Sequence, residues 1–600
     1  IKESNHERYG SGKIMTEKRM KIGSIIAALL SAGAISLTLQ WKTSNVITGV
    51  MALLFFYFYE KQGTIYRSLP DKRKQVAAFA VSMLLTCFMC MQGLEYLDEY
   101  EGITGIGKVC IIACMLAGYG SLFYMLLQWI YRGFDKLNLQ SGRESKYTSR
   151  QIFFFVMILM FFCWLPFFLK NYPGVIISDS MDQIGQAVSG QYSNHHPVVQ
   201  TWILQFFLMI GNHWTGELTT GIALYCIAQM LVLSAIYAYF IAECYAHDVK
   251  KWVCVLLFLF YGILPYNVMY AINIWKDSLF SGALLLFGIL LWKLMKQKEA
   301  KKITWIMQEI VLVLSGCIVT LFRNNGFHAF LVVVPFVIVL CWKKNKQTIA
   351  AVVLVVLATL VIRGPVFAHF EVTPADTIES LSIPAQQIAR TIANGGELTM
   401  EEQELLGKII DIDAISDAYD EGLSDPIKSL VRQSGNQEYL EQNKAAYLNL
   451  WLHIGMRYPM NYIRAFLHQT EGYWYPDVQR WVYTEGICEN SGRMVIEPKL
   501  PAMLSQMIGK GILWSGYTKV PFYGLLWSIG LAVWLTFILA GYSFTRGKYK
   551  DLLYYLPMLA LWGTLLVATP VNGEFRYIYA IFLCVPFYII MSKVDAEDVI

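Results

Sequence analysis

The chain has 600 residues, of which 56% are hydrophobic and only 16% are charged, and its mean hydropathy is +0.43. Soluble proteins carry roughly 25% charged residues, so this composition excludes an ordinary soluble enzyme and indicates an all-α polytopic membrane protein. The net charge is only +5, and we expect no nucleic-acid partner.

Apolar runs of about 18–25 residues, the length that crosses a bilayer as a helix, recur along the chain. Counting them predicts about 14 transmembrane helices. Their approximate limits are 21–40, 46–60, 75–93, 106–131, 151–170, 217–243, 252–271, 278–295, 303–321, 327–342, 347–363, 520–541, 552–570 and 577–592.

Basic residues gather in alternate connections between these runs. Clusters such as Lys72–Lys74, Lys296–Lys302 and Lys343–Lys346 mark the cytoplasmic side, because positive residues are retained inside, and this places both termini in the cytoplasm. The apolar segment Val198–Gly211 is too short to cross comfortably, and a crossing there would move the last two clusters outside. We therefore expect it to lie as a helix at the outer interface.

The runs and the charges together predict four regions. Residues 1–149 hold a cytoplasmic segment and four spans. Residues 150–363 form a transmembrane core with an outer loop at 171–216, and residues 520–600 add three more spans. Between them, residues 364–519 form a domain outside the cytoplasm.

This external domain is acidic and is expected to be mostly helical. It contains 20 Asp and Glu and 12 Lys and Arg, a net charge of −8 that leaves +13 on the rest of the chain. The sequence Thr399-Met-Glu-Glu402 is a capping box, and Pro426 after Asp425 sets a helix start.

Four polar motifs fall at the predicted outer ends of spans. An ionisable cluster where a membrane-embedded body meets water is a candidate reaction centre. A carboxylate can deprotonate an acceptor hydroxyl, and Arg or Lys can stabilise a departing phosphate. The predicted catalytic residues are Asp179 and Asp182, and the predicted substrate- or phosphate-binding residues are His195, His196, Lys276, Asp277, Arg323, Asn324, Glu574 and Arg576.

Each motif also has a purely structural interpretation. Asp179 and Asp182 are one helical turn apart and would suit the N-terminus of a surface helix. The histidine pair before Pro197 would suit a turn, the Lys-Asp and Glu-x-Arg motifs would suit local ion pairs, and Arg323 could reach lipid headgroups.

Other cofactor sites can be set aside on spacing. Gly102–Lys108 nearly spells a phosphate-binding loop, but Val109 stands where Ser or Thr would hold magnesium. The motif HExxH is missing from the sequence, and the CxxC spacing of Cys87 and Cys90 lies inside the apolar run 75–93. No cofactor is therefore expected with certainty, and a divalent metal is left open.

The order of these motifs resembles the GT-C superfamily of polyprenol-dependent glycosyltransferases. The run Tyr172-Pro-Gly174, Asp179-Ser-Met-Asp182, His195-His196-Pro197 and the helix Val198–Gly211 is similar to the D…(H/K)-P-P/V…W-x-L pattern of the lipid A aminoarabinose transferases and protein O-mannosyltransferases. A second Pro after Pro197 is missing. The resemblance covers residues 150–363 and implies that Asp179 is the catalytic carboxylate and Asp182 its partner.

The sequence therefore predicts a multi-pass glycosyltransferase of the bacterial plasma membrane. Its donor would be a sugar on a polyprenyl phosphate, held among membrane lipids, and its acceptor an envelope glycan, glycolipid or protein outside the cytoplasm. Two alternatives remain open: a transporter or flippase of lipid-linked saccharides, and a non-catalytic partner in envelope assembly.

Overall fold

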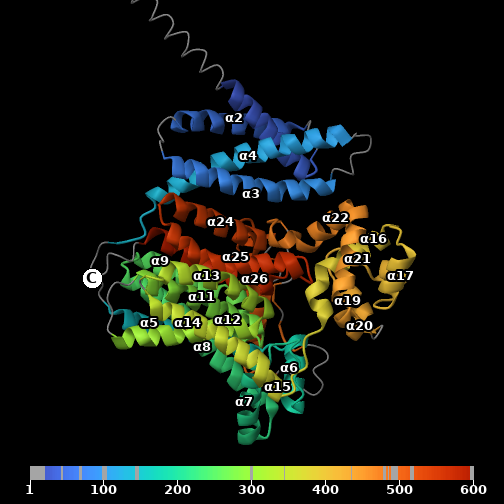
Figure 1. Cartoon of the computed structure of the whole chain (residues 1–600). Coiled ribbons are helices and arrows are strands. Elements are labelled where there is room, and N and C mark those ends of the chain that lie inside the picture. Colours follow the sequence, from blue (N-terminus) through green and yellow to red (C-terminus); the bar gives the residue numbers. More distant parts are fainter. Residues whose placement is uncertain are drawn as a thin grey trace, which may run out of the picture. The chain divides into compact units, whose positions relative to one another are not determined.

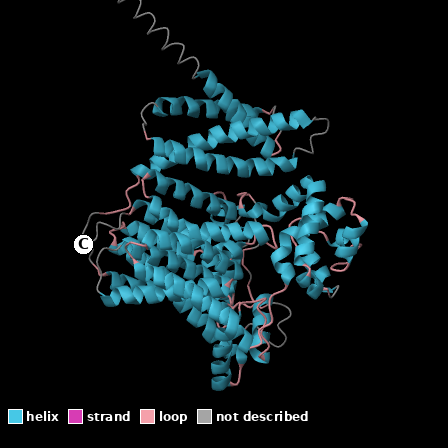
Figure 2. Cartoon of the chain, in the orientation of Figure 1, coloured by secondary structure: helices cyan, strands magenta, loops and turns pink. Residues whose placement is uncertain are grey.

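The computed structural model describes most of the chain. The described residues are 21–41, 45–66, 71–96, 105–141, 147–296, 302–343, 345–433, 436–477, 482–483, 485–487, 497–513, 516 and 519–594. Within these ranges every regular element is a helix, and extended backbone pairs only in isolated bridges (Figure 2). The predicted all-helical class is confirmed for this part of the protein.

Eleven of the described helices are long and apolar enough to cross a membrane, so the chain is a multi-pass membrane protein. They are Lys21–Thr38, Lys72–Leu94, Gly105–Lys136, Ser149–Lys170, Leu218–Ala246, Lys276–Lys296, Lys302–Phe322, Asn324–Cys341, Lys346–His369, Tyr549–Ala568 and Phe575–Lys593.

The three remaining runs of the predicted 14 do not meet this test as single helices. The run at 252–271 folds as two helices, α9 (Lys251–Ile263) and α10 (Pro265–Ile272), with a bend of 51° between them. Proline clashes with the carbonyl four residues back, which explains a break at Pro265. The run at 520–541 contains a shorter apolar helix, α24 (Ile529–Thr545), and the helix α2 (Val46–Tyr66) is not among the eleven.

The chain folds into two units, each held together mainly by packing within itself. Unit 1 consists of residues 1–137 and 537–549. It contains α2, α3 (Lys72–Tyr96) and α4 (Gly105–Lys136), and the last two pack along each other.

Unit 2 consists of residues 138–536 and 550–600 and contains all the predicted site residues. Most of its membrane helices are labelled in Figure 1. They are α5 (Ser149–Lys170), α8 (Leu218–Ala246), α9, α10, α11 (Lys276–Lys296), α12 (Lys302–Phe322), α13 (Asn324–Cys341), α14 (Lys346–Val361) with η1 (Ile362–Val366) and α15 (Phe367–His369), α25 (Leu552–Ala568) and α26 (Phe575–Lys593).

The centre of unit 2 is the pair α11 and α26, which pack against each other. Of their most apolar windows, 78% and 72% of the residues are buried, against 28% in α5 and 22% in the span that begins at Lys346. The helices with few buried residues have apolar faces left for lipid, because lipid tails are as apolar as a protein core. The helices α11 and α26 begin at Lys276 and Phe575, next to two of the polar motifs.

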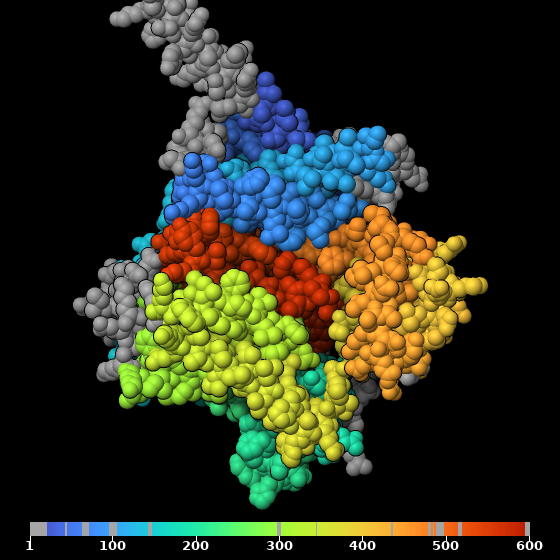
Figure 3. Space-filling model, viewed as in Figure 1, coloured from blue at the N-terminus to red at the C-terminus, as the bar shows by residue number. Residues whose placement is uncertain are grey.

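The helices of the external domain form a lobe of their own in unit 2 (Figures 1 and 3). Its core contains Ile388, Leu406, Ile427, Leu440 and Ile454. The capping box at Thr399 is present as predicted. The helices are η2 (Thr377–Leu381), α16 (Ser382–Ala393), α17 (Met400–Gly407), α18 (Ile415–Ala418), α19 (Asp425–Gln433), α20 (Gln437–Gln442), α21 (Lys444–Arg457), α22 (Pro459–Thr470) and η3 (Glu471–Tyr473).

Short helices complete the part of unit 2 near the predicted outer side. The helices α6 (Ser178–Ser189) and α7 (Val198–Thr215) make up most of the predicted outer loop 171–216, and α7 packs against α8. Helix α7 is not among the candidate spans, although its place at an interface stays a prediction. The others are α23 (Ala502–Met507), η4 (Ile508–Ile512) and η6 (Tyr523–Trp527); η7 (Tyr549–Asp551) leads into α25.

Candidate functional site

The loop that leads into α6 is held against the segment between α10 and α11. Val175 forms a parallel bridge with Asn273, through N–H to O distances of 3.0 and 3.2 Å. Gly174 precedes it with a φ of 152°, and a Cβ there would lie 2.4 Å from the sulfur of Cys226. Only glycine allows this close approach, so local sequence places the start of α6 beside Lys276.

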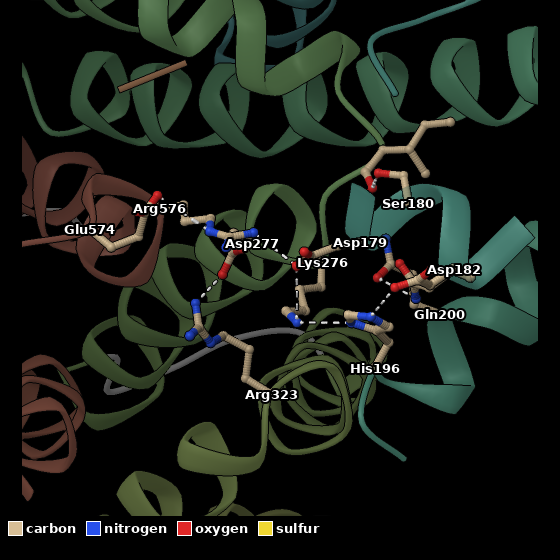
Figure 4. A network of polar contacts seen from close by, with 12 residues as sticks. Asp179, Ser180, Asp182, His196, Gln200, Lys276, Asp277, Arg323, Glu574 and Arg576 are labelled. Carbon is tan, nitrogen blue, oxygen red and sulfur yellow. Dashed lines mark hydrogen bonds and ion pairs between the residues drawn. The ribbon is translucent and has the colours of Figure 1, made fainter. Parts of the chain in front are cut away.

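The first turn of α6 carries Asp179 into the site. The neighbouring Ser180 is fully buried, and its hydroxyl donates to the carbonyl of Ile274 at 2.7 Å. Asp179 Oδ2 accepts from Arg576 Nη1 at 2.8 Å and lies 3.6 Å from Lys276 Nζ. Figure 4 shows this carboxylate between the two cations, which come from the starts of α26 and α11.

The two cations determine the protonation state of Asp179. Burial by itself raises the pKa of this carboxyl, but the charges of Lys276 and Arg576 together outweigh burial and hold the pKa well below its usual range. Asp179 is therefore an anion at any physiological pH. Such a carboxylate is a weak proton acceptor and a strong counter-ion.

Asp182, one turn further along α6, has a different environment. Its side chain is 68% exposed, and Oδ2 lies 3.3 Å from His196 Nε2. Partial burial and the negative charge of Asp179 raise the pKa of Asp182, while His195 lowers it. Asp182 is thus the more basic and the more accessible carboxylate of the pair.

His196 connects Asp182 to Lys276. Its ring is only 6% exposed, and its Nδ1 lies 3.5 Å from Lys276 Nζ. An ammonium group can only donate, so Nδ1 accepts from Lys276 and the proton of the neutral ring resides on Nε2, which donates to Asp182. Burial and the charge of Lys276 lower the pKa of His196 to about 3, in agreement with a neutral ring.

This environment predicts a stability that depends on pH through His196. The folded state keeps the ring neutral, whereas the unfolded chain binds a proton below a pKa of about 6.5, so stability rises with pH across this interval. Between pH 6.5 and pH 4.5 the protein should lose about 2–3 kcal/mol through this residue. His196→Gln should flatten the dependence of the unfolding midpoint on pH in detergent.

The exposed neighbour His195 is the matched control, because its ring packs edge-on against His196 at 4.7 Å but is not enclosed. His195→Gln should leave the pH dependence as in the unchanged protein. An equal flattening by both substitutions would contradict the buried, neutral state of His196.

The ion pair of Arg323 and Asp277 forms the buried bottom of the site. Arg323 Nη1 donates to Asp277 Oδ1, and the two side chains are 9% and 0% exposed. The guanidinium lies 4.6 Å from the ring centroid of Tyr577 and 5.7 Å from that of Phe280. Its Nε donates to Asn325 Oδ1 at 3.2 Å. The guanidinium of Arg323 therefore makes polar contacts along its edge and ring contacts on its faces.

A glycine lets α13 begin at this point. A Cβ on Gly326 would lie 2.2 Å from the carbonyl oxygen of Val319 and 2.7 Å from the ring of Phe280. Because Gly326 has none, α12 and α13 approach closely at their connection. This approach directs Arg323 toward α11 and α26.

Glu574 ends the loop before α26, and Arg576 lies in the first turn of that helix. Arg576 Nε lies 3.3 Å from Glu574 Oε1, and the guanidinium lies 5.6 Å from the ring centroid of Trp275. The external domain fixes this loop through backbone hydrogen bonds. Ser424 N–H donates to Pro570 O at 2.8 Å, and Asn572 N–H donates to Gly422 O at 2.9 Å.

Ion pairs and hydrogen bonds join six of the ten predicted site residues in one network, and they join two more as a separate pair. His195 adds a ring contact with His196. Asn324 is exposed at the start of α13, and its neighbour Asn325 makes the contact with Arg323. The six are Asp179, Asp182, His196, Lys276, Glu574 and Arg576, and the separate pair is Asp277 and Arg323.

Sequence reasoning did not single out the aromatic floor of this network or the hydroxyl of Ser180. Trp275 and Tyr577 lie under the guanidinium groups of Arg576 and Arg323. Each aromatic residue is adjacent in sequence to a predicted cation, and this adjacency is the signal that could have found them. A ring beneath a cation suits cation–π attraction.

The described residues provide no ligand set for the divalent metal that the sequence left open. Among the described residues no group of three or more His, Cys, Asp or Glu is arranged to hold a metal ion. Asp179, the most acidic side chain of the site, already has two cationic partners.

Comparisons with known proteins give one match. Neither the curated proteins nor the solved structures yield a match to the chain. The family model that matches covers residues 186–599, which include the site residues from His195 to Arg576 and begin after Asp179 and Asp182. Because the model covers more than half of the chain, the protein belongs to the DUF6020 family, described as a family of unknown function.

Proposed function

We propose that the protein is a membrane glycosyltransferase that uses a polyprenyl-phosphate-linked sugar and resembles the GT-C superfamily. One observation supports this most: polar residues from the connections that follow α5, α10, α12 and α25 lie together, as one network of six residues and the adjacent pair Arg323 and Asp277 (Figure 4). The network combines an exposed carboxylate, a neutral imidazole and cations beside apolar helices. Transfer from a phosphate-linked lipid needs this set.

The proposed reaction is a single displacement. The acceptor hydroxyl oxygen attacks the anomeric carbon of the sugar, the bond from that carbon to the phosphate oxygen breaks, and polyprenyl phosphate leaves with the bonding electron pair. The hydroxyl proton passes to Asp182. Attack opposite to the leaving phosphate inverts the anomeric carbon.

The roles proposed for the two carboxylates differ from those that the resemblance implies. The resemblance favours Asp179 as the base, but the two cations on this carboxylate make it a weak proton acceptor. Asp182 is exposed, has a raised pKa and accepts a hydrogen bond from neutral His196. We therefore assign the role of general base to Asp182. The role assigned to Asp179 is to position Lys276 and Arg576.

Lys276 and Arg576 are the proposed phosphate-binding residues. Their side chains are 16% and 17% exposed, so they border the open part of the site rather than its buried bottom. A guanidinium binds phosphate oxygens through a planar fork and an ammonium as a point charge. Arg323 supports them from below, because Asp277, Asn325 and two rings already hold it.

The orientation of the site is part of the proposal. With α7 at an interface, the charge rule places the site and the external domain outside and the basic connections inside. Single cysteines at the exposed positions Ser189 and Glu401 should react with an impermeant maleimide added to intact cells, in a background without native cysteines. Cysteines at Lys302 and Lys346 should react only after permeabilisation, and labelling of Lys302 from outside would overturn this topology.

Purified protein tests the activity directly. Incubation with a panel of polyprenyl-phosphate sugars and envelope acceptors should yield a new glycosidic bond and free polyprenyl phosphate, both detectable by mass spectrometry. Movement of unaltered carrier lipid across reconstituted vesicles would favour a flippase. Neither outcome in the presence of all donors would favour a non-catalytic assembly partner.

The break between α9 and α10 is the observation that would favour a transporter, because broken helices often present free backbone groups to a substrate. Here the carbonyl of Phe260 accepts from Asn267 Nδ2 at 2.7 Å, and the carbonyl of Leu264 accepts from the N–H groups of Asn267 and Val268. These groups are satisfied within the protein, which favours the transferase.

A further inference from the structure

The bend between α9 and α10 borders a cavity of about 610 Å³. This volume lies within the range of about 300–1,000 Å³ that is usual for small-molecule sites. Residues from η4 and η6 complete the wall. The lining includes Leu259, Ile263, Pro265, Gly511, Ile512 and Trp527.

The wall of this cavity is apolar because the bend leaves its backbone groups paired. Asn267, which is 1% exposed, donates to Phe260 O, and its own Oδ1 accepts from Tyr579 O–H at 2.7 Å. Unpaired carbonyls would have bound water or a cation. With these groups satisfied, the cavity suits a hydrocarbon chain.

The segment formed by α23 and η4, which contributes Gly511 and Ile512 to the cavity wall, has an apolar surface outside the membrane-spanning helices. Met503, Met507 and Ile512 are 75%, 60% and 48% exposed. Exposed apolar side chains on a short helix beside a membrane are expected to enter the interface. The segment therefore lies where lipid chains and headgroups are available.

The charges on the segment 500–545, which contributes one wall of the cavity, have one sign. Between residues 500 and 545 the sequence has no Asp or Glu, and the basic residues are Lys510 and Lys519. Both lysines are exposed. Lys510 directly precedes the lining residue Gly511, and Lys519 precedes the lining residue Tyr523 by four positions. Exposed lysines at a membrane surface attract anionic headgroups.

A packed aromatic layer lies between the cavity wall and the charged network of the candidate site. The ring of Tyr266 lies 4.9 Å from that of Trp527 and 5.3 Å from that of Phe575, which directly precedes Arg576. Tyr266 and Phe575 are 0% and 1% exposed. A chain in the cavity would therefore not place its phosphate on Arg576, which argues against the polyprenyl donor as the occupant.

We propose that this cavity is a binding site for an acyl chain of an anionic phospholipid whose headgroup lies at Lys510 and Lys519. This inference does not depend on the proposed transferase activity. The probe is phosphatidylglycerol, added to delipidated protein in detergent and compared with phosphatidylcholine of the same chains by native mass spectrometry. The unchanged protein should retain one phosphatidylglycerol in preference to phosphatidylcholine.

Gly511 offers a substitution that fills the cavity. A Cβ at this position meets no atom within 4 Å, so Gly511→Trp can place its ring in the cavity without moving backbone. We expect at least tenfold less bound phosphatidylglycerol. Gly563 in α25 has the same open surroundings but is not part of the lining, and Gly563→Trp should bind as the unchanged protein does.

The lysines separate the headgroup from the chain. Lys510→Gln with Lys519→Gln should lower the preference for phosphatidylglycerol over phosphatidylcholine about tenfold, while the total of bound lipid persists. Retention of phosphatidylglycerol by folded Gly511→Trp would overturn the site. Competition with polyprenyl phosphate needs no variant: displacement of phosphatidylglycerol by equimolar polyprenyl phosphate from the unchanged protein would overturn the proposed occupant.

Discussion

Asp182→Asn is expected to lower the rate of sugar transfer by about 10²–10⁴-fold, the usual loss when a general base is removed. Asp182 lies at the open side of the site with its side chain 68% exposed, and His196 donates to it at 3.3 Å. The amide cannot take the acceptor proton, but it can still accept that hydrogen bond. Donor binding and the unfolding midpoint in detergent should therefore remain unchanged while turnover falls.

The pH dependence of turnover offers a second measurement of the same role. Burial and Asp179 raise the pKa of Asp182 above its ordinary value. Because the base must be deprotonated, turnover should increase with pH through that raised pKa and then level off. The acidic limb should disappear from the residual activity of Asp182→Asn.

Two variants serve as comparisons. Glu401→Gln removes an exposed carboxylate of the external domain and should leave turnover unchanged. Asp179→Asn removes the anion between Lys276 and Arg576. These two phosphate-binding cations should then be held less firmly, and the fold should be less stable. Full turnover in Asp182→Asn together with complete loss in Asp179→Asn at normal stability would return the base to Asp179.

The sequence was sufficient to predict the helical class and the motifs of the site. Apolar run length identified all eleven candidate spans, and Thr399 with Glu402 forms the predicted capping box. Apolar run length does not show the helix breaks inside a run, although residues such as Pro265 signal them. The structure also divides the amphipathic stretch that begins near Glu438 at Asn443, between α20 and α21.

The roles of the charged residues could not be predicted in the same way. Asp179 and Asp182 look equivalent in sequence, yet Arg576, which is 397 residues away from Asp179, neutralises only the first of them. Arg323 looks like an exposed cation at a helix end. Its engagement depends on Asp277 and Tyr577, which belong to two other helices. A pKa or a counter-ion follows from such tertiary contacts, and the sequence pattern does not contain them.

The second large effect is expected from the buried pair of Arg323 and Asp277. Asp277→Asn should destabilise the protein by about 3–5 kcal/mol, because removal of one partner leaves a buried charge without compensation. Both side chains are nearly excluded from solvent. Chemical unfolding of the purified protein in detergent would measure the difference in the free energy of unfolding.

The double variant Asp277→Leu with Arg323→Met tests whether this cost arises from the uncompensated charge. A buried ion pair replaced by apolar residues of similar volume is often neutral in stability, so the double variant should be more stable than Asp277→Asn alone. The exposed pair of Glu404 and Lys408 is the matched control, with side chains 74% and 48% exposed. Glu404→Gln should leave the free energy of unfolding nearly unchanged, because exposed pairs contribute little. If Arg323→Met abolished donor binding and left stability unchanged, Arg323 would be a phosphate ligand, as the sequence suggests, and its role as buried support would be wrong.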